Sequence, residues 1–459
     1  MTILIITLLG LALRLILAGQ SLWLDEAASV VIASLPIKTL FASLAGDFHP
    51  PLYYLLLKPW LSIAGQTEWL LRLPGILIGT LTIPALYYLV KQTKLKVATL
   101  AALFLALNPL HIYYSQELRM YSLSALLAVL TWYFLSKKKF FLFTLATIAS
   151  FYTFYLSIFI LASQWLYMLF YNKKRIKPFL FSNLIFVIFC LPWLPTLFSQ
   201  LKGGGYLTTA LPGWSALSGD LSLKSLVLIP AKFSLGRISI LPKNLYYLII
   251  ALVLAFVSLL FVLTLRVKRS KLFLFWLFTP LVLAILVSTV TPILGYWRYI
   301  FLLPAFSTLL AIGISYLPKK TFALNLSFLI LLFLFSNLFF ITNPKFHREN
   351  WSSFAKLVKQ KQDTLLIVNF TDAFAPLKFY LPNSKVFPTQ VKLGQTRGDI
   401  DETLPPLITP DTTIFYLDYL SDLTSPDRSI LIWLETAGLK KSAIYQFEGL
   451  GAVYEYQAP

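Results

Sequence analysis

Apolar runs of about 20 residues recur through the first 342 positions of this chain, and they restrict it to one broad class of fold. A helix of that length crosses the hydrocarbon core of a bilayer. Apolar residues make up 58% of the chain and charged residues 13%. We therefore predict a polytopic α-helical membrane protein. Residues 1–18 lack a basic start and a small-residue cleavage site and contain Arg14, so we expect a retained helix and not a signal peptide.

The basic residues indicate the topology. Sixteen lysines and arginines stand in short segments that contain no acid, at residues 91–96, 137–139, 173–177, 266–271 and 319–320. The positive-inside rule makes these segments cytoplasmic, so the net charge of +20 is not a nucleic-acid signal. About eleven crossings follow, with the fifth and sixth turning tightly around Thr153. They are expected near residues 2–19, 70–90, 97–111, 119–136, 140–153, 155–171, 178–198, 244–265, 272–290, 299–317 and 322–342.

This topology places every acid of the first 344 residues on the external side. The six acids are Asp25, Glu26, Asp47, Glu68, Glu117 and Asp220. They fall in three predicted external loops, residues 20–69, 111–119 and 199–243. In the first loop, residues 37–44 and 52–63 suit short helices that lie in the membrane interface. The clustering predicts a chemical site at the external membrane surface.

The composition changes after residue 343. Residues 344–459 carry balanced charge and are predicted to form an external soluble α/β domain, while residues 1–343 form the transmembrane catalytic domain. Residues 364–370 and 412–417 are predicted strands, 373–380 and 429–437 helices, and 443–456 a terminal strand pair. The strands resemble a small doubly wound sheet, but no Gly-x-Gly-x-x-Gly follows one, which leaves nucleotide binding unsupported.

Four external features carry polar residues suited to chemistry. Asp25 and Glu26 follow the interface anchor Trp23; they either form part of a site or cap the next helix. His49, in the rigid turn Asp47-Phe48-His49-Pro50-Pro51-Leu52-Tyr53-Tyr54, could donate to a phosphate, ligate a metal or merely cap the turn.

The other two features are arginine-containing. Glu117 and Arg119, in the segment from Asn108 to Tyr121, either pair at a helix end or belong to a site. Arg298, in Tyr296-Trp297-Arg298-Tyr299, either snorkels to the interface or binds a lipid-borne phosphate through its planar fork.

Two further patterns are predicted to carry no chemistry. Gly203 to Gly205 is expected to be a flexible loop tip, because no Lys-Ser/Thr follows to make a phosphate cradle. Asn369-Phe370-Thr371 fits the glycosylation sequon but lies in a predicted buried strand, which argues against modification.

Together these motifs resemble those of the GT-C membrane glycosyltransferases. The resemblance rests on an Asp-Glu pair after the first helix, His-Pro-Pro-Leu in the same loop, and Tyr-Ser-Gln-Glu-x-Arg-x-Tyr in the second loop. It is closest to glycosyltransferase family 39, the protein O-mannosyltransferases, and to the transferases that add aminoarabinose to lipid A. It covers roughly residues 1–340; the C-terminal domain matches only in position.

The resemblance implies an inverting transfer of a sugar from a polyisoprenyl phosphate to an acceptor hydroxyl on a glycolipid, glycan or protein. It implies a plasma (inner) membrane location, with the site and the C-terminal domain external. Asp25 would be the general base, with Glu26 beside it, and Glu117 would orient hydroxyl groups. Substrate-binding side chains would come from the residues around them. The candidates are Arg298, Arg119 and His49 for the phosphate, and Tyr53, Tyr54, Tyr121 and Trp297 for the sugar or lipid.

Some points depart from the resemblance or stay open. The eukaryotic protein mannosyltransferases carry a lysine after His-Pro-Pro-Leu where this chain has Tyr53, and the 199–243 loop is too short for a β-trefoil insert. A divalent metal is conceivable if Asp25, Glu26, His49, His111 and Glu117 converge, although no spacing specifies one. The alternative function is a lipid-linked sugar transporter or flippase, against which stands the lack of an internal repeat.

Overall fold

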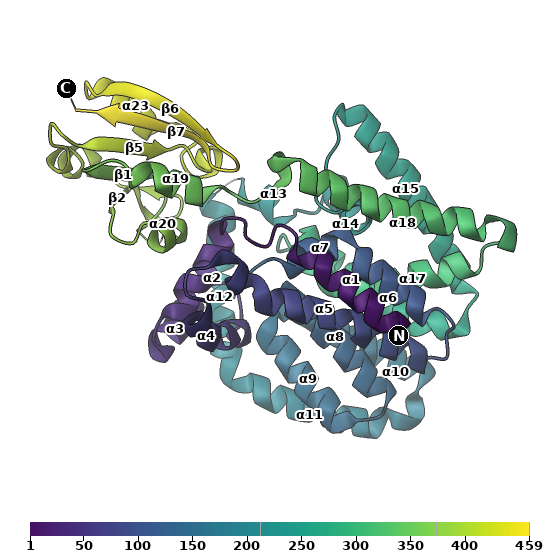
Figure 1. The fold of residues 1–459 in the computed structure, drawn as a ribbon. Helices are drawn as coiled ribbons and strands as arrows, with labels where there is room; N and C mark the ends of the chain where they lie inside the picture. The colour runs from purple at the N-terminus through teal and green to yellow at the C-terminus, as the bar shows by residue number, and fades with distance from the viewer. Residues whose placement is uncertain (212, 373, 459) are drawn as a thin grey trace.

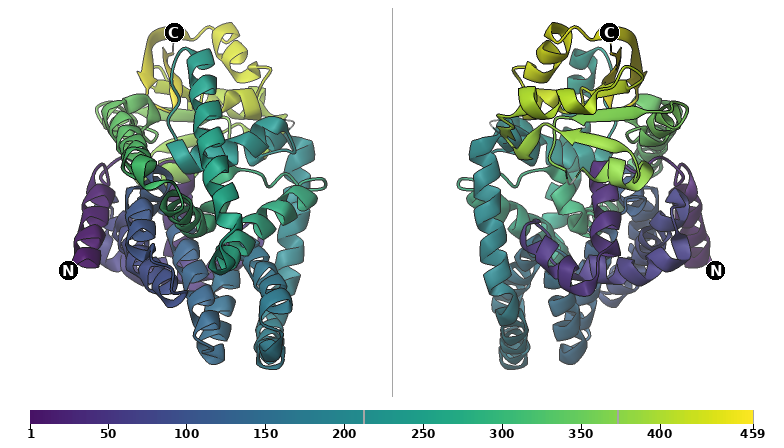
Figure 2. Two further views of the ribbon diagram at one scale, coloured as in Figure 1. Left: turned by 90° about the vertical axis from the view of Figure 1, so that its right-hand side faces the viewer. Right: turned by 90° about the vertical axis from the view of Figure 1, so that its left-hand side faces the viewer.

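The computed structural model describes residues 1–211, 213–372 and 374–458. Helices occupy the described chain as far as Thr342, and the first strand begins at Thr364. The strand-containing C-terminal domain lies at one end of the helices, above the short helices of residues 24–64, and the two side views agree on this placement (Figures 1 and 2).

All segments predicted to cross a membrane are apolar helices. Within the described ranges, six helical segments are long and apolar enough to do so: Glu68–Gln92, Lys173–Ala210, Lys243–Leu265, Lys268–Val287, Tyr296–Ser315 and Lys319–Thr342. Five more are apolar but shorter: Thr2–Leu15, Ala98–Leu107, Tyr121–Ser136, Phe140–Thr153 and Tyr155–Tyr171. The predicted positions of these helices are confirmed, including the tight turn at Thr153, except that the helix predicted over 97–111 ends at Leu107; the number that cross stays a prediction.

The bundle helices, all labelled in Figure 1 except α16, are α1 (Thr2–Leu15), α5 (Glu68–Gln92), α6 (Ala98–Leu107), α8 (Tyr121–Ser136), α9 (Phe140–Thr153), α10 (Ile158–Tyr171), α11 (Ile176–Cys190), α15 (Lys243–Leu265), α16 (Lys271–Val287), α17 (Leu303–Ser315) and α18 (Lys319–Thr342).

Helix α17 lies at the centre of the bundle. Its residues from Leu303 to Ile314 are buried on every side, as expected for a helix that is apolar all round. It packs against α6, α15 and α16. At Gly313 an added Cβ would lie 2.5 Å from the Leu260 carbonyl oxygen of α15, so only glycine permits this close approach.

The segment that follows α1 folds into three short helices. They are α2 (Leu24–Ser34), α3 (Ile37–Ala45) and α4 (Leu52–Ala64), separated by the breaks at Pro36 and Pro50-Pro51, so both predicted interfacial helices are present. Lys58 of α4 caps the end of α2, because its Nζ donates to the carbonyl oxygens of Ala33 at 3.2 Å and Leu35 at 2.6 Å. This first segment is thereby tied into one unit.

The second polar segment begins earlier than predicted. Helix α6 ends at Leu107, and a separate helix α7 (Pro109–Ser115) precedes Glu117. Asn108 causes the break: its Oδ1 caps α7 by accepting from the His111 amide at 2.9 Å, and its Nδ2 donates to the Phe233 carbonyl at 2.8 Å. Pro109 fits the first turn of α7 because no amide is needed there.

The expectation of a flexible loop tip at Gly203 to Gly205 is wrong, since these glycines lie inside helix α12 (Leu194–Ala210). Contacts on either side of the glycines outweigh their low helix propensity. Gln200 donates to the Leu44 carbonyl at 2.6 Å, and the hydroxyl of Tyr206 donates to the Leu393 carbonyl at 3.2 Å. Short helices α13 (Trp214–Ser218) and α14 (Leu223–Leu235) complete this region.

The C-terminal domain is a five-stranded mixed sheet in the order β2-β1-β5-β7-β6. Strand β1 (Thr364–Val368) runs parallel to β2 (Lys385–Pro388) and β5 (Thr413–Leu417), whereas the terminal pair β6 (Lys440–Phe447) and β7 (Gly451–Gln457) is antiparallel. The predicted strands and terminal pair are confirmed, and the likeness to a doubly wound sheet holds only for the parallel part.

Both faces of that sheet are covered, which explains why its central strands are continuous apolar runs. Leu366 and Val368 face α19 (Trp351–Val358), while Leu365 and Ile367 face α23 (Ser429–Thr436). Predicted helix 373–380 is α20 (Ala375–Tyr380), its first position lying outside the described residues. The sequon residue Asn369 is buried and donates to Tyr416 and Ser421, consistent with the expectation that it stays unmodified.

Strand β2 and helix α19 were not predicted, and neither were the smaller elements of the domain. These smaller elements are β3 (Gln390–Lys392), β4 (Gln395–Thr396), α21 (Ile400–Thr403) and α22 (Ser421–Thr424).

The C-terminal domain holds the start of α2. The hydroxyl of Tyr380 accepts hydrogen bonds from the Leu22 amide at 2.7 Å and the Ser21 hydroxyl at 3.1 Å, and donates to Glu68 at 3.2 Å. The Ser352 amide donates to the Ser21 hydroxyl at 3.1 Å. These bonds hold Ser21 and Leu22, the residues just before the N-cap Trp23 of α2, against the C-terminal domain.

Candidate active site

A cavity of about 370 Å³ lies where the start of α2, helix α7 and the segment after α18 meet. That volume is within the range of small-molecule sites. Its walls combine carboxylates, guanidinium groups and aromatic rings. The lining residues are Trp23, Asp25, Tyr113, Tyr114, Glu117, Tyr121, Leu217, Arg237, Tyr296, Trp297, His347, Arg348 and Glu349.

Asp25 faces this cavity from the first turn of α2. Its side chain is 41% exposed, and its nearest cation is Arg119, whose Nη2 lies 3.7 Å from Asp25 Oδ2. This separation is longer than a charge-assisted hydrogen bond. Asp25 therefore presents an accessible carboxylate to whatever enters the cavity.

Glu26 points the other way, because successive helical residues differ by about 100° around the axis. It is fully buried, does not line the cavity, and binds Arg72 of α5 at 2.9 Å (Nε) and 2.5 Å (Nη2). Its carboxylate also accepts from the amides of Leu118 at 2.8 Å and Trp23 at 3.4 Å. Burial alone would raise the pKa of Glu26, but Arg348 and Arg72 hold it below the usual value.

Glu26 thus performs the cap role that the sequence offered as an alternative for the acidic pair, and it joins α2 to α5. A role in chemistry for Glu26 has no geometric support, although the sequence grouped it with Asp25.

Glu117 lies in the wall beside Arg348. Arg348 Nη1 is 3.3 Å from Glu117 Oε2 and 3.6 Å from Glu26 Oε2. Burial raises the pKa of Glu117 to about 7, and the charge of Arg348 offsets only part of that rise. Glu117 can therefore be protonated or ionised near neutral pH.

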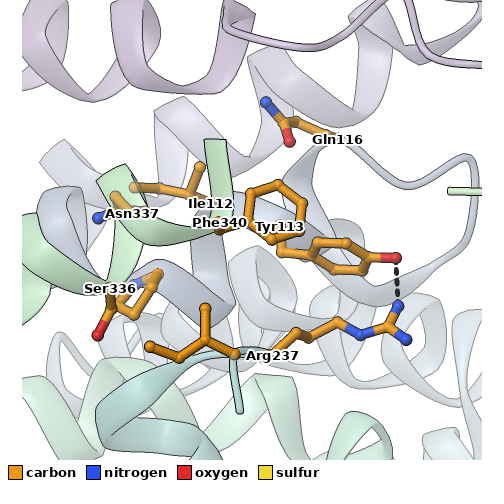
Figure 3. Close-up of a pocket in the computed structure, with 9 residues that line it drawn as sticks. Ile112, Tyr113, Gln116, Arg237, Ser336, Asn337 and Phe340 are labelled. Atoms are coloured by element: carbon orange, nitrogen blue, oxygen red, sulfur yellow. Dashed lines mark hydrogen bonds between the residues drawn. The ribbon is translucent and has the colours of Figure 1, made fainter. Parts of the chain in front are cut away.

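Two arginines flank the ring of Tyr113. The guanidinium carbons of Arg237 and Arg348 lie 4.6 Å and 4.5 Å from the ring centroid, as in cation–π contacts. Figure 3 shows the Arg237 guanidinium hydrogen-bonded to the Tyr113 hydroxyl. The small space of that view, about 20 Å³, shares Tyr113 and Arg237 with the main cavity. Two guanidinium groups that line the same cavity suit an anion such as a phosphate.

Sequence reasoning missed both arginines. Position in the sequence did not single them out, because Arg237 shares the predicted 199–243 loop with several lysines and Arg348 lies in the charge-balanced C-terminal domain.

Arg298, the preferred phosphate candidate, is used elsewhere. Its Nη1 donates to the carbonyl oxygens of Ser218 at 2.5 Å and Pro292 at 3.0 Å, and Arg298 is absent from the cavity lining. Its neighbour Trp297 does line the cavity, as does Tyr121. Arg298 therefore supports the wall and does not face the cavity in this arrangement.

The remaining candidates form a layer behind Asp25. His49 and Arg119 are hydrogen-bonded to each other at 3.0 Å, and the Tyr54 hydroxyl donates to Asp47 at 2.9 Å. Tyr53 packs edge to face on Tyr54. None of His49, Arg119, Tyr53 and Tyr54 is among the lining residues, so the structure places them next to the site but not at its surface.

The five residues considered for a metal do not gather. Glu26 is paired with Arg72, and His111 Nδ1 lies 2.7 Å from Arg14 Nη2. Among the described residues, no group of three or more His, Cys, Asp or Glu side chains is arranged to hold an ion.

Glu349 is a third carboxylate at the cavity that the sequence analysis did not single out. It accepts from the Leu24 amide at 3.0 Å, Trp351 Nε1 at 2.7 Å and the Tyr419 hydroxyl at 2.8 Å. Its pKa is raised, because burial outweighs those hydrogen bonds. Glu349 links the C-terminal domain to the first turn of α2.

Comparison with known families and structures agrees with the resemblance seen in the motifs. The model of the family described as dolichyl-phosphate-mannose-protein mannosyltransferase matches residues 48–195, which include the His-Pro-Pro-Leu turn and Glu117. No curated protein sequence matches the chain.

The fold is that of solved GT-C proteins. ArnT from Cupriavidus metallidurans in the apo state matches with a TM-score of 0.58 and 13% identity, over 99% of this chain and 98% of that one. The same protein bound to undecaprenyl phosphate gives 0.58 and 13%, over 98% and 97%. The Archaeoglobus fulgidus oligosaccharyltransferase, in complex with Zn and sulfate, gives 0.51 and 11%, over 100% and 73%. The predicted GT-C fold, with its strand-containing C-terminal domain, is confirmed.

Proposed function

We propose that the protein is an inverting glycosyltransferase that moves a sugar from a polyisoprenyl-phosphate donor to an acceptor hydroxyl. One observation carries this proposal: an accessible carboxylate, Asp25, shares a cavity with the arginines Arg237 and Arg348. The family match and the GT-C fold support the same chemistry. ArnT from Cupriavidus metallidurans has been solved with undecaprenyl phosphate bound, a polyisoprenyl phosphate of the class that leaves in the proposed reaction.

The proposed reaction is a single displacement. Asp25 accepts the proton of the acceptor hydroxyl as its oxygen attacks the anomeric carbon. The bond from that carbon to the phosphate oxygen breaks, and the lipid phosphate leaves with the electron pair. Arg237 and Arg348 compensate the charge that develops on the phosphate. Attack opposite the leaving group inverts the anomeric centre.

The other side chains of the cavity position the substrates. Glu117, when ionised, accepts a hydrogen bond from a sugar or acceptor hydroxyl. Tyr121 and Trp297 offer ring faces to the sugar or to the first isoprene units. Arg119 and His49 act from behind Asp25. Arg298 fixes Trp297 through its bonds to the backbone.

We further propose that the site faces the external side of a plasma (inner) membrane, with the C-terminal domain over it. The basic segments assigned to the cytoplasm support this orientation. The acceptor is a hydroxyl of a glycolipid, an envelope glycan or a protein, and membrane lipids surround the helices. Residues 1–343 form the catalytic membrane domain and 344–459 the external one, with Arg348 and Glu349 reaching back into the site.

The test is sugar transfer from a radiolabelled polyprenyl-phosphate hexose. Purified protein in lipid is given membrane extract as acceptor, and wild type is compared with Asp25→Asn. We expect transfer by wild type to fall by about a hundredfold or more in the variant while donor binding is retained. Asp411→Asn is the matched control, because Asp411 is an exposed aspartate just before β5, at the opposite end of that strand from Tyr419.

Equal transfer by wild type and Asp25→Asn would remove Asp25 from the mechanism. Donor binding followed by movement of the intact lipid-linked sugar across the bilayer, with no transfer, would favour the flippase alternative.

A further inference from the structure

A chain of polar side chains leads away from Asp25 into the protein. Arg119 Nη2 lies 3.7 Å from Asp25 Oδ2 and 3.0 Å from His49 Nε2. His49 Nδ1 lies 3.3 Å from Asp47 Oδ2, and the Tyr54 hydroxyl donates to the same Asp47 oxygen at 2.9 Å. The chain therefore ends on a second carboxylate that is outside the cavity lining.

The donor and acceptor roles along this chain follow from its chemistry. A guanidinium group can only donate, so His49 Nε2 must accept from Arg119. A neutral imidazole that accepts at Nε2 carries its proton on Nδ1, and that proton is donated to Asp47. Burial and the neighbouring Arg119 lower the pKa of His49, which agrees with a neutral ring. The Gln200 side chain donates to the His49 carbonyl at 3.3 Å and helps to fix the backbone of this turn.

Arg119 is thus shared between two acids. An arginine with a single carboxylate neighbour normally forms a close, two-pronged pair, as Arg72 does with Glu26. Arg119 instead stays 3.7 Å from Asp25, with a direct hydrogen bond to His49. Behind that hydrogen bond lies the Asp47 carboxylate, whose Oδ2 is 3.3 Å from His49 Nδ1.

We propose that Asp47, acting through His49, is a positioning residue that keeps Arg119 from closing onto Asp25, so that Asp25 stays free to accept a proton. The link to catalysis rests on the proposed function, whereas the effect on Asp25 itself does not. Without the charge of Asp47, Arg119 would pair closely with Asp25, and Asp25 would hold a proton less tightly and be a weaker base.

Other titratable groups around Asp25 and Arg119 come from several elements, and Glu117 also interacts with Arg119. Tyr54 belongs to α4, Tyr121 to α8, Glu349 to the segment before α19, and Tyr419 to the end of β5. Because Tyr54 also donates to Asp47, substitutions of His49, which leave that hydrogen bond in place, are needed to assign a shift to the link through His49.

The experiment measures the protonation of Asp25 directly. Protein in detergent is treated with a carbodiimide at a series of pH values, since this reagent modifies carboxyl groups in their protonated form, and labelling of Asp25 is quantified by mass spectrometry. In Asp47→Asn we expect the midpoint of labelling to move to lower pH by about half a unit or more. Asp411→Asn, which removes an exposed aspartate, should leave the midpoint where it is in wild type.

A pair of substitutions at His49 tests the link itself. His49→Gln keeps one acceptor and one donor and should stay close to wild type, whereas His49→Ala breaks the chain and should shift the midpoint in the same direction as Asp47→Asn. An unmoved midpoint in Asp47→Asn, or an equal shift in His49→Gln and His49→Ala, would overturn the proposal. If size-exclusion chromatography shows that Asp47→Asn is not folded, the comparison of His49→Gln with His49→Ala tests the proposal alone.

The labelling result separates this proposal from the proposed function. Absence of sugar transfer in wild type would contradict glycosyl transfer while the midpoints remain measurable. Where transfer is present, the acid limb of the profile of kcat/KM against pH should move with the labelling midpoint. A loss of kcat/KM that is uniform across pH would indicate a merely structural role for Asp47.

Discussion

The two faces of helix α2 carry neighbouring acids in opposite environments. On one face, Asp25 is 41% exposed to the cavity and has one distant cation. On the other, Glu26 is fully buried, holds Arg72 by two hydrogen bonds and accepts two backbone amides. Two adjacent acids in a sequence are therefore not necessarily one functional unit. The turn of the helix divides this pair into a group available for chemistry and a group that holds the helix in place.

The strongest way to test this division is to neutralise the buried face. Glu26→Gln leaves the Arg72 guanidinium buried without its counter-charge, so we expect the free energy of unfolding to fall by about 3–5 kcal/mol. Chemical denaturation in detergent, followed by tryptophan fluorescence, measures it. A variant as stable as wild type would mean that the Arg72 pair does not hold α2 in place.

Glu117 lies between the two cases, because it is buried but only partly paired, and its effect is expected to be smaller and dependent on pH. Burial raises its pKa to about 7 from the usual 4.5. Between these values the folded protein binds more protons than the unfolded chain, so stability falls as pH rises through this window and is level above it. We expect a fall of about 1–3 kcal/mol from this group in wild type.

Glu117→Gln should remove that contribution to the slope, while Asp411→Asn should retain it. Denaturation at pH 5 and pH 8 distinguishes the two. If the free energy of unfolding changed by the same amount between pH 5 and pH 8 in wild type and in Glu117→Gln, the raised pKa of Glu117 would be contradicted.

The exposed face should give the smallest effect on folding. Asp25→Asn, expected to abolish transfer, should change the free energy of unfolding by no more than about 0.5 kcal/mol, because a distant, solvent-exposed ion pair contributes little. The same denaturation assay measures it. A loss of unfolding free energy as large as that of Glu26→Gln would show that both faces hold the helix in place, and it would contradict the separate roles of Asp25 and Glu26.

The sequence was informative where one local physical property decides the structure. Length and hydrophobicity locate the bundle helices, continuous apolar runs locate β1 and β5, and prolines locate the breaks around α3. The motifs around His49 and Glu117 also led to the fold, which the comparisons bear out. The prediction for Gly203 to Gly205 was wrong, because α12 is kept helical by hydrogen bonds from Gln200 and Tyr206 to distant parts of the chain.

The composition of the cavity could not be predicted, because it depends on contacts between distant segments. Arg237 and Arg348 both contact Tyr113, although each stands more than a hundred residues after Tyr113 in the chain. The sequence favoured Arg298 as the phosphate ligand, but in the folded structure its guanidinium group is already hydrogen-bonded to the backbone carbonyls of Ser218 and Pro292. Which face of α2 each acid takes follows from helix geometry, but which face is buried depends on the Arg72 partner in α5.

The cavity draws Trp23 and Asp25 from the beginning of the chain and Arg348 and Glu349 from beyond the last long apolar helix. This arrangement has a consequence for biosynthesis. A nascent chain leaving the ribosome must complete all of its apolar helices before it acquires the second arginine and the carboxylate that anchors the first turn of α2. Copies that stop after residue 342 but before residue 349 therefore lack part of the cavity lining, although they already contain every long apolar helix.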